Sequence, residues 1–263
     1  MSKEKIYTAR WFNKKIQDTS TEESVKKLAS QQWIVLSELI GDQDILIEEP
    51  ERPNQSELGK KLLWYPKAEI PAEKMPTRGN YASNYPVGAV VHFTAGRSLK
   101  GDSDAINTIR GGIANGYCYF CISSTGTVFQ SFPLNKWGYH CGKSAWPGLG
   151  TSLSNKLVGI EICNAGKLDK NGNAWFGEHY PEDQRRTVGA EYGESGTYHK
   201  YTDAQEKSLS ELLVWLKLNN PEVFNVNYIV GHHEISPGRK NDPCGSLSVT
   251  MPALRDKIKE LTK

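Results

Sequence analysis

The chain has 263 residues, which is long enough for one domain of about 150 to 200 residues with its own core and for a smaller additional segment. Its charge is nearly balanced, with 32 basic and 30 acidic side chains, so it lacks the basic surplus expected of a nucleic-acid-binding protein. No apolar run reaches the roughly 18 residues that a membrane span needs, and the longest candidate, residues 33–40, is interrupted by Ser37 and Glu38.

The N-terminal residues do not have the pattern of an export signal. Residues 1–17 alternate charged and apolar side chains and contain no continuous apolar stretch, so we expect synthesis in the cytoplasm without a signal peptide. Five cysteines, an odd number, fit reduced thiols better than a disulfide framework. We also expect the protein to be a monomer that does not bind membranes.

The first part of the chain predicts a small helical segment. Ser20 and Glu23 have the spacing of a capping box, and apolar residues at near-helical spacing follow them, which predicts a helix over residues 20–41. Residues 49–61 are polar and contain two prolines and a glycine, which is typical of a linker. The predicted division is therefore an N-terminal module or extension of unknown role and a larger catalytic domain, residues 1–65 and 66–263.

The first half of the larger domain predicts a strand, a helix and a hairpin. Residues 87–92 are apolar and β-branched and predict a buried strand that ends on His92. Isoleucines at helical spacing over 106–113 predict a short amphipathic helix. Two strand-like runs within 117–132 flank a Ser-Ser-Thr-Gly turn, so we expect a hairpin with Gly126 at its tight position.

The second half continues the alternation of strands and helices. Residues 157–163 predict another strand, whereas residues 165–201 have no clear period and predict a long loop over one face. Thr202 begins a capping-box pattern and a leucine-striped helix, residues 226–230 predict a buried strand, and residues 254–261 predict a final helix. This order predicts an α/β fold in which helices flank a mixed central β-sheet.

Residues 231–244 contain the most distinctive polar motif, Gly-His-His-Glu-Ile-Ser-Pro-Gly-Arg-Lys-Asn-Asp-Pro-Cys. Pro237 breaks regular structure soon after the predicted strand, so we expect Lys240 and Asp242 on a loop that folds back over the strand end. His232 and Asp242 could then bind one metal ion, because zinc accepts imidazole and carboxylate ligands.

Glu161 is an isolated carboxylate in an apolar strand. Because Ile160 and Ile162 flank it, the pleat directs Glu161 to the opposite face from those two residues. Together with the histidines and the lysine, it supplies the parts of a zinc hydrolase, in which a carboxylate takes a proton from water and an ammonium stabilises the oxyanion. The alternative is a structural carboxylate that pairs with a lysine or arginine across the sheet.

These motifs resemble the zinc-dependent N-acetylmuramoyl-L-alanine amidases of the amidase-2 type. The resemblance covers about residues 85–262 and includes phage amidase endolysins, bacterial recycling amidases and peptidoglycan recognition proteins. It rests on motifs that occur in the family's order and approximate spacing, namely VVHFTAG, YCYFCISSTGTVFQ, WGYHCG, VGIEI and GHHEISPGRKNDP.

The resemblance implies a role for five residues. His92, His232 and Asp242 match the zinc ligands, Glu161 matches the general base, and Lys240 matches the lysine that stabilises the tetrahedral oxyanion. It implies zinc-dependent hydrolysis of the amide bond between N-acetylmuramic acid and L-alanine. The expected cofactor is Zn²⁺, and the expected partners are peptidoglycan or muropeptides.

Two other histidines need an assignment. His140 matches a histidine in the family's Trp-His-Ala-Gly-like segment, which implies a substrate-binding residue near the site that does not hold metal. Its alternative is a buried histidine with a hydrogen-bonding role. His233 is adjacent to His232, but both cannot aim at the same ion from an extended strand end.

The cysteines offer alternative ligands. Cys244 is a soft ligand close to the motif, but the spacing from Lys240 favours Asp242 as the third ligand. Cys118 and Cys121 have the spacing of a metal knuckle, yet on a strand they point to opposite faces, so we interpret them as core thiols.

The full set of five residues favours an enzyme over a binding module of the same fold, because non-catalytic recognition proteins typically lack the third ligand. The extra N-terminal residues favour a phage-type endolysin, which would reach the cell wall after membrane permeabilisation. The alternatives are a cytosolic muropeptide-recycling amidase and a non-catalytic peptidoglycan-binding protein. The segment 165–201 also exceeds the short connection of the smallest relatives.

Overall fold

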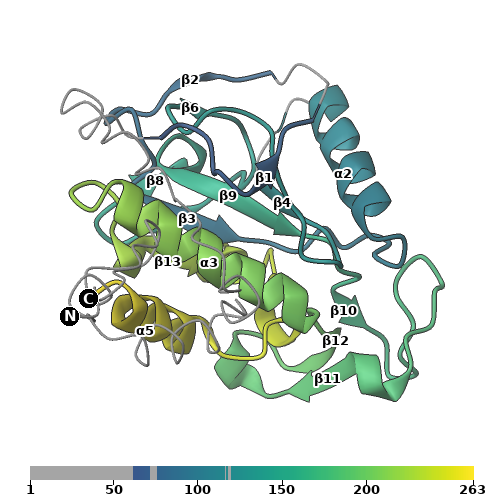
Figure 1. Cartoon of the computed structure of the whole chain (residues 1–263). Helices are drawn as coiled ribbons and strands as arrows, with labels where there is room; N and C mark the ends of the chain where they lie inside the picture. Colours follow the sequence, from purple (N-terminus) through teal and green to yellow (C-terminus); the bar gives the residue numbers. More distant parts are fainter. Residues whose placement is uncertain (1–61, 72–75, 116, 118–119) are drawn as a thin grey trace, which may run out of the picture. The chain divides into compact units, whose positions relative to one another are not determined.

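A computed structural model describes residues 62–71, 76–115, 117 and 120–263 (Figure 1). The helix expected over residues 20–41 and the polar linker at 49–61 lie outside the described residues. The division at residue 65 is not tested by the structure and stays a prediction.

A mixed six-stranded sheet forms the centre of the fold. Four neighbouring strands, β4, β9, β3 and β13, run parallel, so their carboxyl ends lie at one edge, and β5 pairs antiparallel with β4. In sheet order the strands are β1 (Ala68–Glu69), β5 (Val128–Gln130), β4 (Phe120–Ile122), β9 (Leu157–Ile162), β3 (Gly88–Val91) and β13 (Ile229–Gly231).

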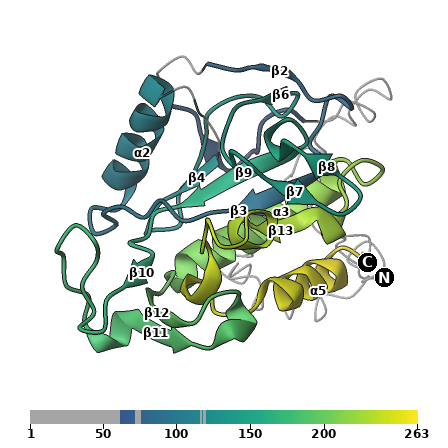
Figure 2. The ribbon, with the colours of Figure 1, turned by 180° about the vertical axis from the view of Figure 1, so that it is seen from behind.

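Helices cover both faces of this sheet. The helix α2 (Asp102–Asn115) lies on one face, and α3 (Asp203–Asn219) and α5 (Met251–Leu261) lie on the other (Figures 1 and 2). The pleat of β4 divides its side chains between the two layers: Phe120 packs with the leucines of α3, whereas Cys121 packs with Ile109 of α2. The predicted α/β fold with a mixed sheet flanked by helices is confirmed.

The helix signals in the sequence correspond closely to the structure. At the start of α3 the Thr202 side chain accepts a hydrogen bond from the Gln205 backbone, and the Gln205 side chain accepts one from the Thr202 backbone, which completes the capping box. The leucine stripe of α3 is buried in the main core, and so are Leu254 and Ile258 of α5. The helix expected around residues 106–113 is α2.

The prediction of a strand over residues 226–230 is wrong in part. Residues Val226–Tyr228 form a short 3-10 helix, η5, and the strand β13 begins only at Ile229. The Asn225 side chain accepts a hydrogen bond from the backbone of Asn227, which favours a turn over an extended chain. His232 does not end a strand either, because it begins the short helix α4 (His232–Ile235).

The prediction of a long loop over residues 165–201 is also wrong. This segment contains a second, antiparallel sheet of three strands in the order β10, β12, β11. The strands have two to four residues each, too few to produce a recognisable alternation in the sequence. The elements are β10 (Lys167–Leu168), η3 (Glu182–Gln184), β11 (Arg185–Val188), η4 (Ala190–Tyr192) and β12 (Gly196–His199).

Short elements complete the described part of the chain. They are the paired strands β2 (Gly79–Asn80) and β6 (Lys136–Trp137), the paired strands β7 (Ala145–Trp146) and β8 (Gly150–Thr151), and the 3-10 helices η2 (Leu153–Asn155) and η6 (Cys244–Ser246). Within the described residues, none of the helices has the length and apolar character of a membrane span. The four described cysteines are free and buried: Cys121, Cys141, Cys163 and Cys244.

Candidate metal centre and active site

The register of three parallel strands brings two histidines and a glutamate to one edge of the sheet. Val91 of β3 pairs with Ile160 of β9, and the next residue, His92, donates its backbone N–H to the Ile160 carbonyl at 2.9 Å. His92 and Glu161 therefore lie on the same face of neighbouring strands. On the other side of β3, Gly231 of β13 pairs with Val91, which places His232 beside His92.

The loop after α4 folds back over this edge, as its Pro-Gly sequence predicts. Gly238 adopts a positive φ of 73°, and the backbone N–H groups of Arg239 and Lys240 both donate to the Ser236 carbonyl at 3.1 Å. Further along, the Asp242 carbonyl accepts the backbone N–H of His233 at 2.9 Å. This turn returns the Asp242 side chain to the strand end.

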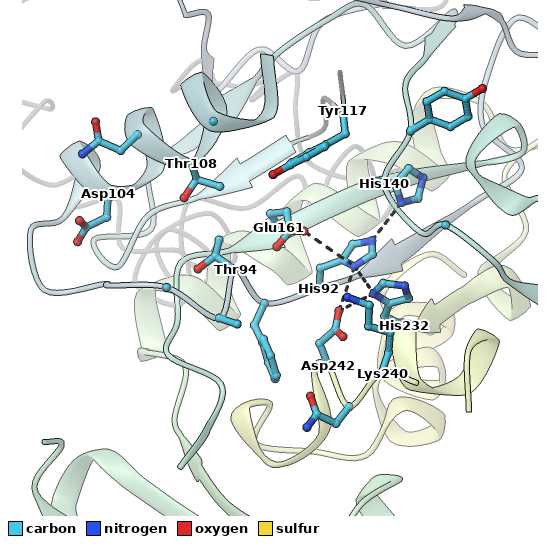
Figure 3. Close-up of a pocket in the computed structure, with 18 of the residues that line it drawn as sticks. His92, Thr94, Asp104, Thr108, Tyr117, His140, Glu161, His232, Lys240 and Asp242 are labelled. Carbon is cyan, nitrogen blue, oxygen red and sulfur yellow. Dashed lines mark hydrogen bonds and ion pairs between the residues drawn. The ribbon is translucent and has the colours of Figure 1, made fainter. Parts of the chain in front are cut away.

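Three side-chain atoms converge at the centre of the site (Figure 3). His92 Nδ1 lies 2.9 Å from His232 Nδ1 and 3.0 Å from Asp242 Oδ2, and His232 Nδ1 lies 2.9 Å from the same carboxylate oxygen. All three residues are buried, with 1%, 3% and 4% of their surface exposed. Among the described residues they form a cluster that could hold a metal ion.

The hydrogen bonds made by Nε2 of His92 and His232 indicate which nitrogen of each neutral ring carries the proton. The Leu157 carbonyl lies 2.9 Å from His140 Nε2 and can only accept, so His140 carries its proton there and its Nδ1 accepts from His92 Nε2 at 3.0 Å. His232 Nε2 lies 3.1 Å from the Cys141 carbonyl, an acceptor, and 3.4 Å from Arg239 Nη2, a donor; the shorter contact favours a proton on Nε2. Neutral His92 and His232 are therefore both unprotonated at Nδ1.

This donor set fits a cation. Two imidazole lone pairs and a carboxylate oxygen face one another within 3.0 Å, an arrangement that is repulsive in itself and that a positive ion would stabilise. The edge of a tetrahedron with zinc-ligand distances of about 2.0 to 2.1 Å is only a few tenths of an ångström longer than these separations. The three residues thus match the ligand pattern of a catalytic zinc site.

Burial keeps His92 and His140 neutral. It lowers the pKa of His92 to about 4, with a further contribution from His232, and it lowers the pKa of His140 well below its usual value. Neutral imidazole and ionised carboxylate are the forms that bind metal.

Glu161 lies beside this centre without joining it. Its Oε1 is 4.0 Å from His92 Nδ1, and its buried Oε2 has no hydrogen-bond partner among the described residues. Burial, with Asp242 adding to it, raises the pKa of Glu161 well above its usual value. Lys240 opposes part of this rise from a distance, but among the described residues Glu161 has no close ion pair with a lysine or arginine of the kind that a purely structural carboxylate would form across the sheet.

The centre opens into a cavity of about 950 Å³. The turn after β3 and one face of α2 form part of its wall and contribute Thr94 and Thr108, and the Tyr117 ring points toward Glu161 (Figure 3). Lys240 lines the cavity from the Asp242 loop and is exposed to it. A substrate in this cavity could therefore meet the histidines, the carboxylates and the ammonium group together.

The competing residues lie elsewhere. His233 Nδ1 is 3.1 Å from the backbone oxygen of Asp242, so its ring is engaged outside the cluster. Cys244 belongs to the main hydrophobic core, and its sulfur is not among the clustered ligand atoms of the described residues. Cys121 is buried with its sulfur 3.8 Å from that of Cys163, and Cys118 lies outside the described residues.

Sequence reasoning missed Arg239. Its Nη2 donates to the carbonyls of Cys141 and Lys143 at 2.7 and 2.8 Å and to the Ser236 hydroxyl at 2.7 Å. The Arg239 guanidinium thus links the loop that carries Asp242 to the loop that contains Cys141 and Lys143. The Cys141 carbonyl is also the group that lies next to His232 Nε2. A motif cannot reveal such a role, because two of the three acceptors are backbone carbonyls nearly 100 positions away.

The family assignment follows from a sequence-family model described as N-acetylmuramoyl-L-alanine amidase, which matches residues 82–245. The chain belongs to this family. Since the match spans more than half of the chain and includes both histidines, Glu161 and Asp242, the protein is an amidase by family, as the motifs predicted. No match was found among curated proteins.

Solved structures of several amidases resemble this one. AmpD shares 22% sequence identity, with 74% of this chain and 96% of that chain covered and a TM-score of 0.49. AmiD from E. coli, solved with anhydro-N-acetylmuramic acid-L-Ala-D-gamma-Glu-L-Lys, shares 20%, with 61% and 52% covered and a TM-score of 0.44. The endolysin LysCS from Clostridium intestinale shares 18%, with 75% and 98% covered and a TM-score of 0.44.

Proposed function

We propose that this amidase is zinc-dependent and hydrolyses the amide bond between N-acetylmuramic acid and L-alanine in peptidoglycan. The observation that carries the proposal is the convergence of His92 Nδ1, His232 Nδ1 and Asp242 Oδ2 within 3.0 Å. We assign these three residues as the ligands. A zinc ion held by them would act as a Lewis acid that polarises the scissile carbonyl and makes water more acidic.

Glu161 is the proposed general base. Its carboxylate lies next to the ligands, and its buried Oε2 is free of hydrogen bonds to the described residues, so it can accept a proton from the attacking water. The raised pKa makes it a stronger base than an exposed glutamate. The same proton can then pass to the leaving amine of L-alanine.

Lys240 is the proposed electrostatic stabiliser of the oxyanion. It lines the cavity two residues before Asp242, and an ammonium group there faces the negative charge that develops on the carbonyl oxygen. Because Glu161 belongs to β9 and Lys240 to the loop that carries Asp242, the two side chains are separate groups that can act on the water and on the carbonyl at the same time.

His140 is proposed to position His92. Both of its ring nitrogens are engaged, one with His92 Nε2 and the other with the Leu157 carbonyl, which leaves neither for a substrate. It holds the proton of His92 at Nε2 and so keeps Nδ1 available for the metal. The expectation that His140 binds substrate directly is an alternative that the contacts do not favour.

The biological role that we propose is that of a phage-type endolysin acting on the polymeric cell wall. Supporting it, residues 1–65 precede the family match and remain available for a separate module of a wall-acting enzyme. A cytosolic muropeptide-recycling amidase is the second candidate, since the catalytic residues would be the same in both.

Two measurements test the proposal. Purified protein is expected to contain one zinc per chain, and a chelator is expected to abolish cleavage until zinc is restored; active protein without a divalent metal would contradict zinc dependence. Products from intact peptidoglycan are then compared with products from soluble anhydro-muropeptides. An endolysin releases stem peptides from the intact wall, whereas activity on the soluble fragments alone would support the recycling role.

A further inference from the structure

Trp175 is the most exposed large hydrophobic side chain in the described part of the chain, with 78% of its surface accessible. It belongs to the segment between β10 and η3 that the sequence pattern does not explain. A single exposed aromatic side chain is ordinary on a protein surface, so the significance of Trp175 depends on how it is held and what it lies beside.

The backbone that carries Trp175 is a tight hairpin. The backbone N–H of Ala174 donates to the Glu178 carbonyl at 2.8 Å, and the N–H of Gly177 donates to the Ala174 carbonyl at 2.8 Å, which places Trp175 and Phe176 at the tip. Gly177 has the positive φ of 84° that such a turn requires. The tip is therefore a defined structure.

The two aromatic residues at the tip have different surroundings. Phe176 packs against a small core cluster formed by Ala165, Leu168, Ala174 and Tyr180, and this contact anchors the hairpin. The Trp175 ring meets that of Phe176 edge-on, with 5.5 Å between the centroids, and remains exposed to solvent. Anchoring thus depends on Phe176 and leaves the Trp175 ring available.

A hydrogen bond attaches Trp175 to the rim of the active-site cavity. Its indole Nε1 donates to the Ala95 carbonyl at 2.7 Å, and Ala95, Gly96 and Arg97 line the cavity in the turn that follows His92. Ala95 has a positive φ of 49°, which is unusual for a residue with a side chain. The polar edge of the indole is thereby fixed at residues that line the cavity, while 78% of the Trp175 surface stays accessible.

We infer that Trp175 is a stacking platform for the sugar side of the substrate, a subsite for the N-acetylated glycan; this inference rests on the proposed function. Of the two groups joined by the scissile bond, alanine offers a single methyl group, whereas a pyranose ring offers a flat C–H face that matches an aromatic ring. Trp175 binds that face while the amide bond lies among His92, Glu161 and His232.

The test measures binding without cleavage. The probe is a peptide-free tetrasaccharide of alternating N-acetylglucosamine and N-acetylmuramic acid, titrated calorimetrically into the zinc-loaded wild-type protein and into Trp175→Ala, Trp175→Phe and Leu218→Ala. Leu218 is a matched control because it is 47% exposed and lies on α3. We expect Trp175→Ala to bind about tenfold more weakly, Trp175→Phe to retain part of the affinity, and Leu218→Ala to bind as the wild type does.

Two results would overturn the inference. One is a tetrasaccharide affinity that is undetectable in the wild type or unchanged in Trp175→Ala at an unchanged melting temperature. The other is a loss of affinity for the tripeptide L-alanyl-γ-D-glutamyl-L-lysine in place of the tetrasaccharide, which would assign Trp175 to the peptide side. Because the tetrasaccharide has no scissile amide, its binding is independent of cleavage. Failure of the proposed function would show instead as the absence of amide hydrolysis in the wild type.

Discussion

At the scale of single residues, Glu161 offers the sharpest separation of chemistry from structure. Glu161→Gln preserves side-chain shape, and the residue is not a proposed ligand, so the variant is expected to keep its zinc and its melting temperature. The rate of amide cleavage is expected to fall by on the order of 10² to 10⁴, the usual contribution of a general base. Zinc content, melting temperature and rate are measured on one sample.

A purely structural role for Glu161 predicts the opposite results. If the carboxylate only stabilises the sheet, the variant melts earlier and turns over at nearly the wild-type rate once folded. A stable, zinc-loaded Glu161→Gln protein with normal turnover would remove the residue from the mechanism. The absence of a hydrogen-bond partner for Oε2 among the described residues argues against a purely structural role.

A second prediction at this scale concerns the third ligand. Asp242→Ala is expected to lose most of its zinc affinity, because it removes one of the three converging atoms. Cys244→Ala is expected to keep the wild-type affinity, although loss of a buried side chain lowers its melting temperature. Competition with a chromogenic chelator measures both, and the reverse pattern would assign the ligand to Cys244.

The sequence predicted which side chains would meet at the site, but it did not predict the backbone groups that hold the histidine rings in place. Motif spacing indicated that His232 and Asp242 would meet through a folded-back loop, and the structure has them 2.9 Å apart. Their roles as ligands stay predictions. The acceptors at Cys141 and Leu157 could not be foreseen, because they are backbone carbonyls whose identity depends only on which loops the fold brings together.

At the scale of elements, strand β9 controls the metal centre through a glycine. A Cβ atom on Gly159 would lie 2.7 Å from Cγ of the His140 ring, so Gly159→Ala must displace that ring. His140 would then lose its hydrogen bond to His92, and we expect zinc affinity to fall by about 10- to 100-fold, as for other losses of support around a metal ligand. The zinc dissociation constant is the measurement.

Gly111→Ala is the matched control for this prediction. Gly111 lies in α2 and also lines the cavity, but an added Cβ meets nothing within 4 Å. The control is expected to bind zinc normally and to gain up to about 1 kcal/mol in stability, because alanine favours the helix. Equal zinc affinities for the two alanine variants would refute the positioning role of His140.

The elements differ in how far the sequence specifies them. The helix α3 could be predicted because its capping box and its leucine stripe are local patterns of 17 residues. The strands β10, β11 and β12 could not, because two to four residues with glycine-rich turns carry no period, and their pairing is fixed by packing around Tyr180 and Tyr198. The hairpin that presents Trp175 was missed for the same reason.

At the scale of the whole molecule, the site exists only because the sheet order joins distant parts of the chain. His92 and Asp242 are 150 positions apart and meet at the carboxyl edge of β3 and β13. No local pattern encodes this strand order, so the sequence predicted a mixed sheet but not which strands would be neighbours. Folding also buries several histidines in their neutral form. The free energy of unfolding therefore depends on pH, because the unfolded chain binds protons that the folded chain does not.

His199 lets that pH dependence be measured away from the metal centre. It is 8% exposed at the end of β12, and its Nδ1 accepts the backbone N–H of Ala165 at 3.2 Å. Its ring packs against that of Tyr180 at a tilt of 35°, with 4.1 Å between the centroids. Burial lowers the pKa of His199 to about 4, whereas an unfolded chain has the ordinary value of 6.5. Between these values the unfolded chain binds a proton that the folded chain does not.

His199 makes the folded protein less stable at acidic pH. Above pH 6.5 the His199 imidazole is neutral in both the folded and the unfolded state, so it does not change the free energy of unfolding. As the pH falls from 6.5 to 4, the free energy of unfolding decreases, and the total decrease below pH 4 is on the order of 3 kcal/mol. In His199→Asn the side-chain oxygen can still accept the Ala165 N–H but does not titrate, so this share of the acid-induced loss is expected to disappear. Urea unfolding of metal-free protein at pH 8, 6, 5 and 4 measures it, with the exposed His179→Asn as control. His92 and His140 titrate equally in all three proteins and cancel in the comparison, so parallel curves for His199→Asn and the wild type would show that His199 is not the source of the acid sensitivity.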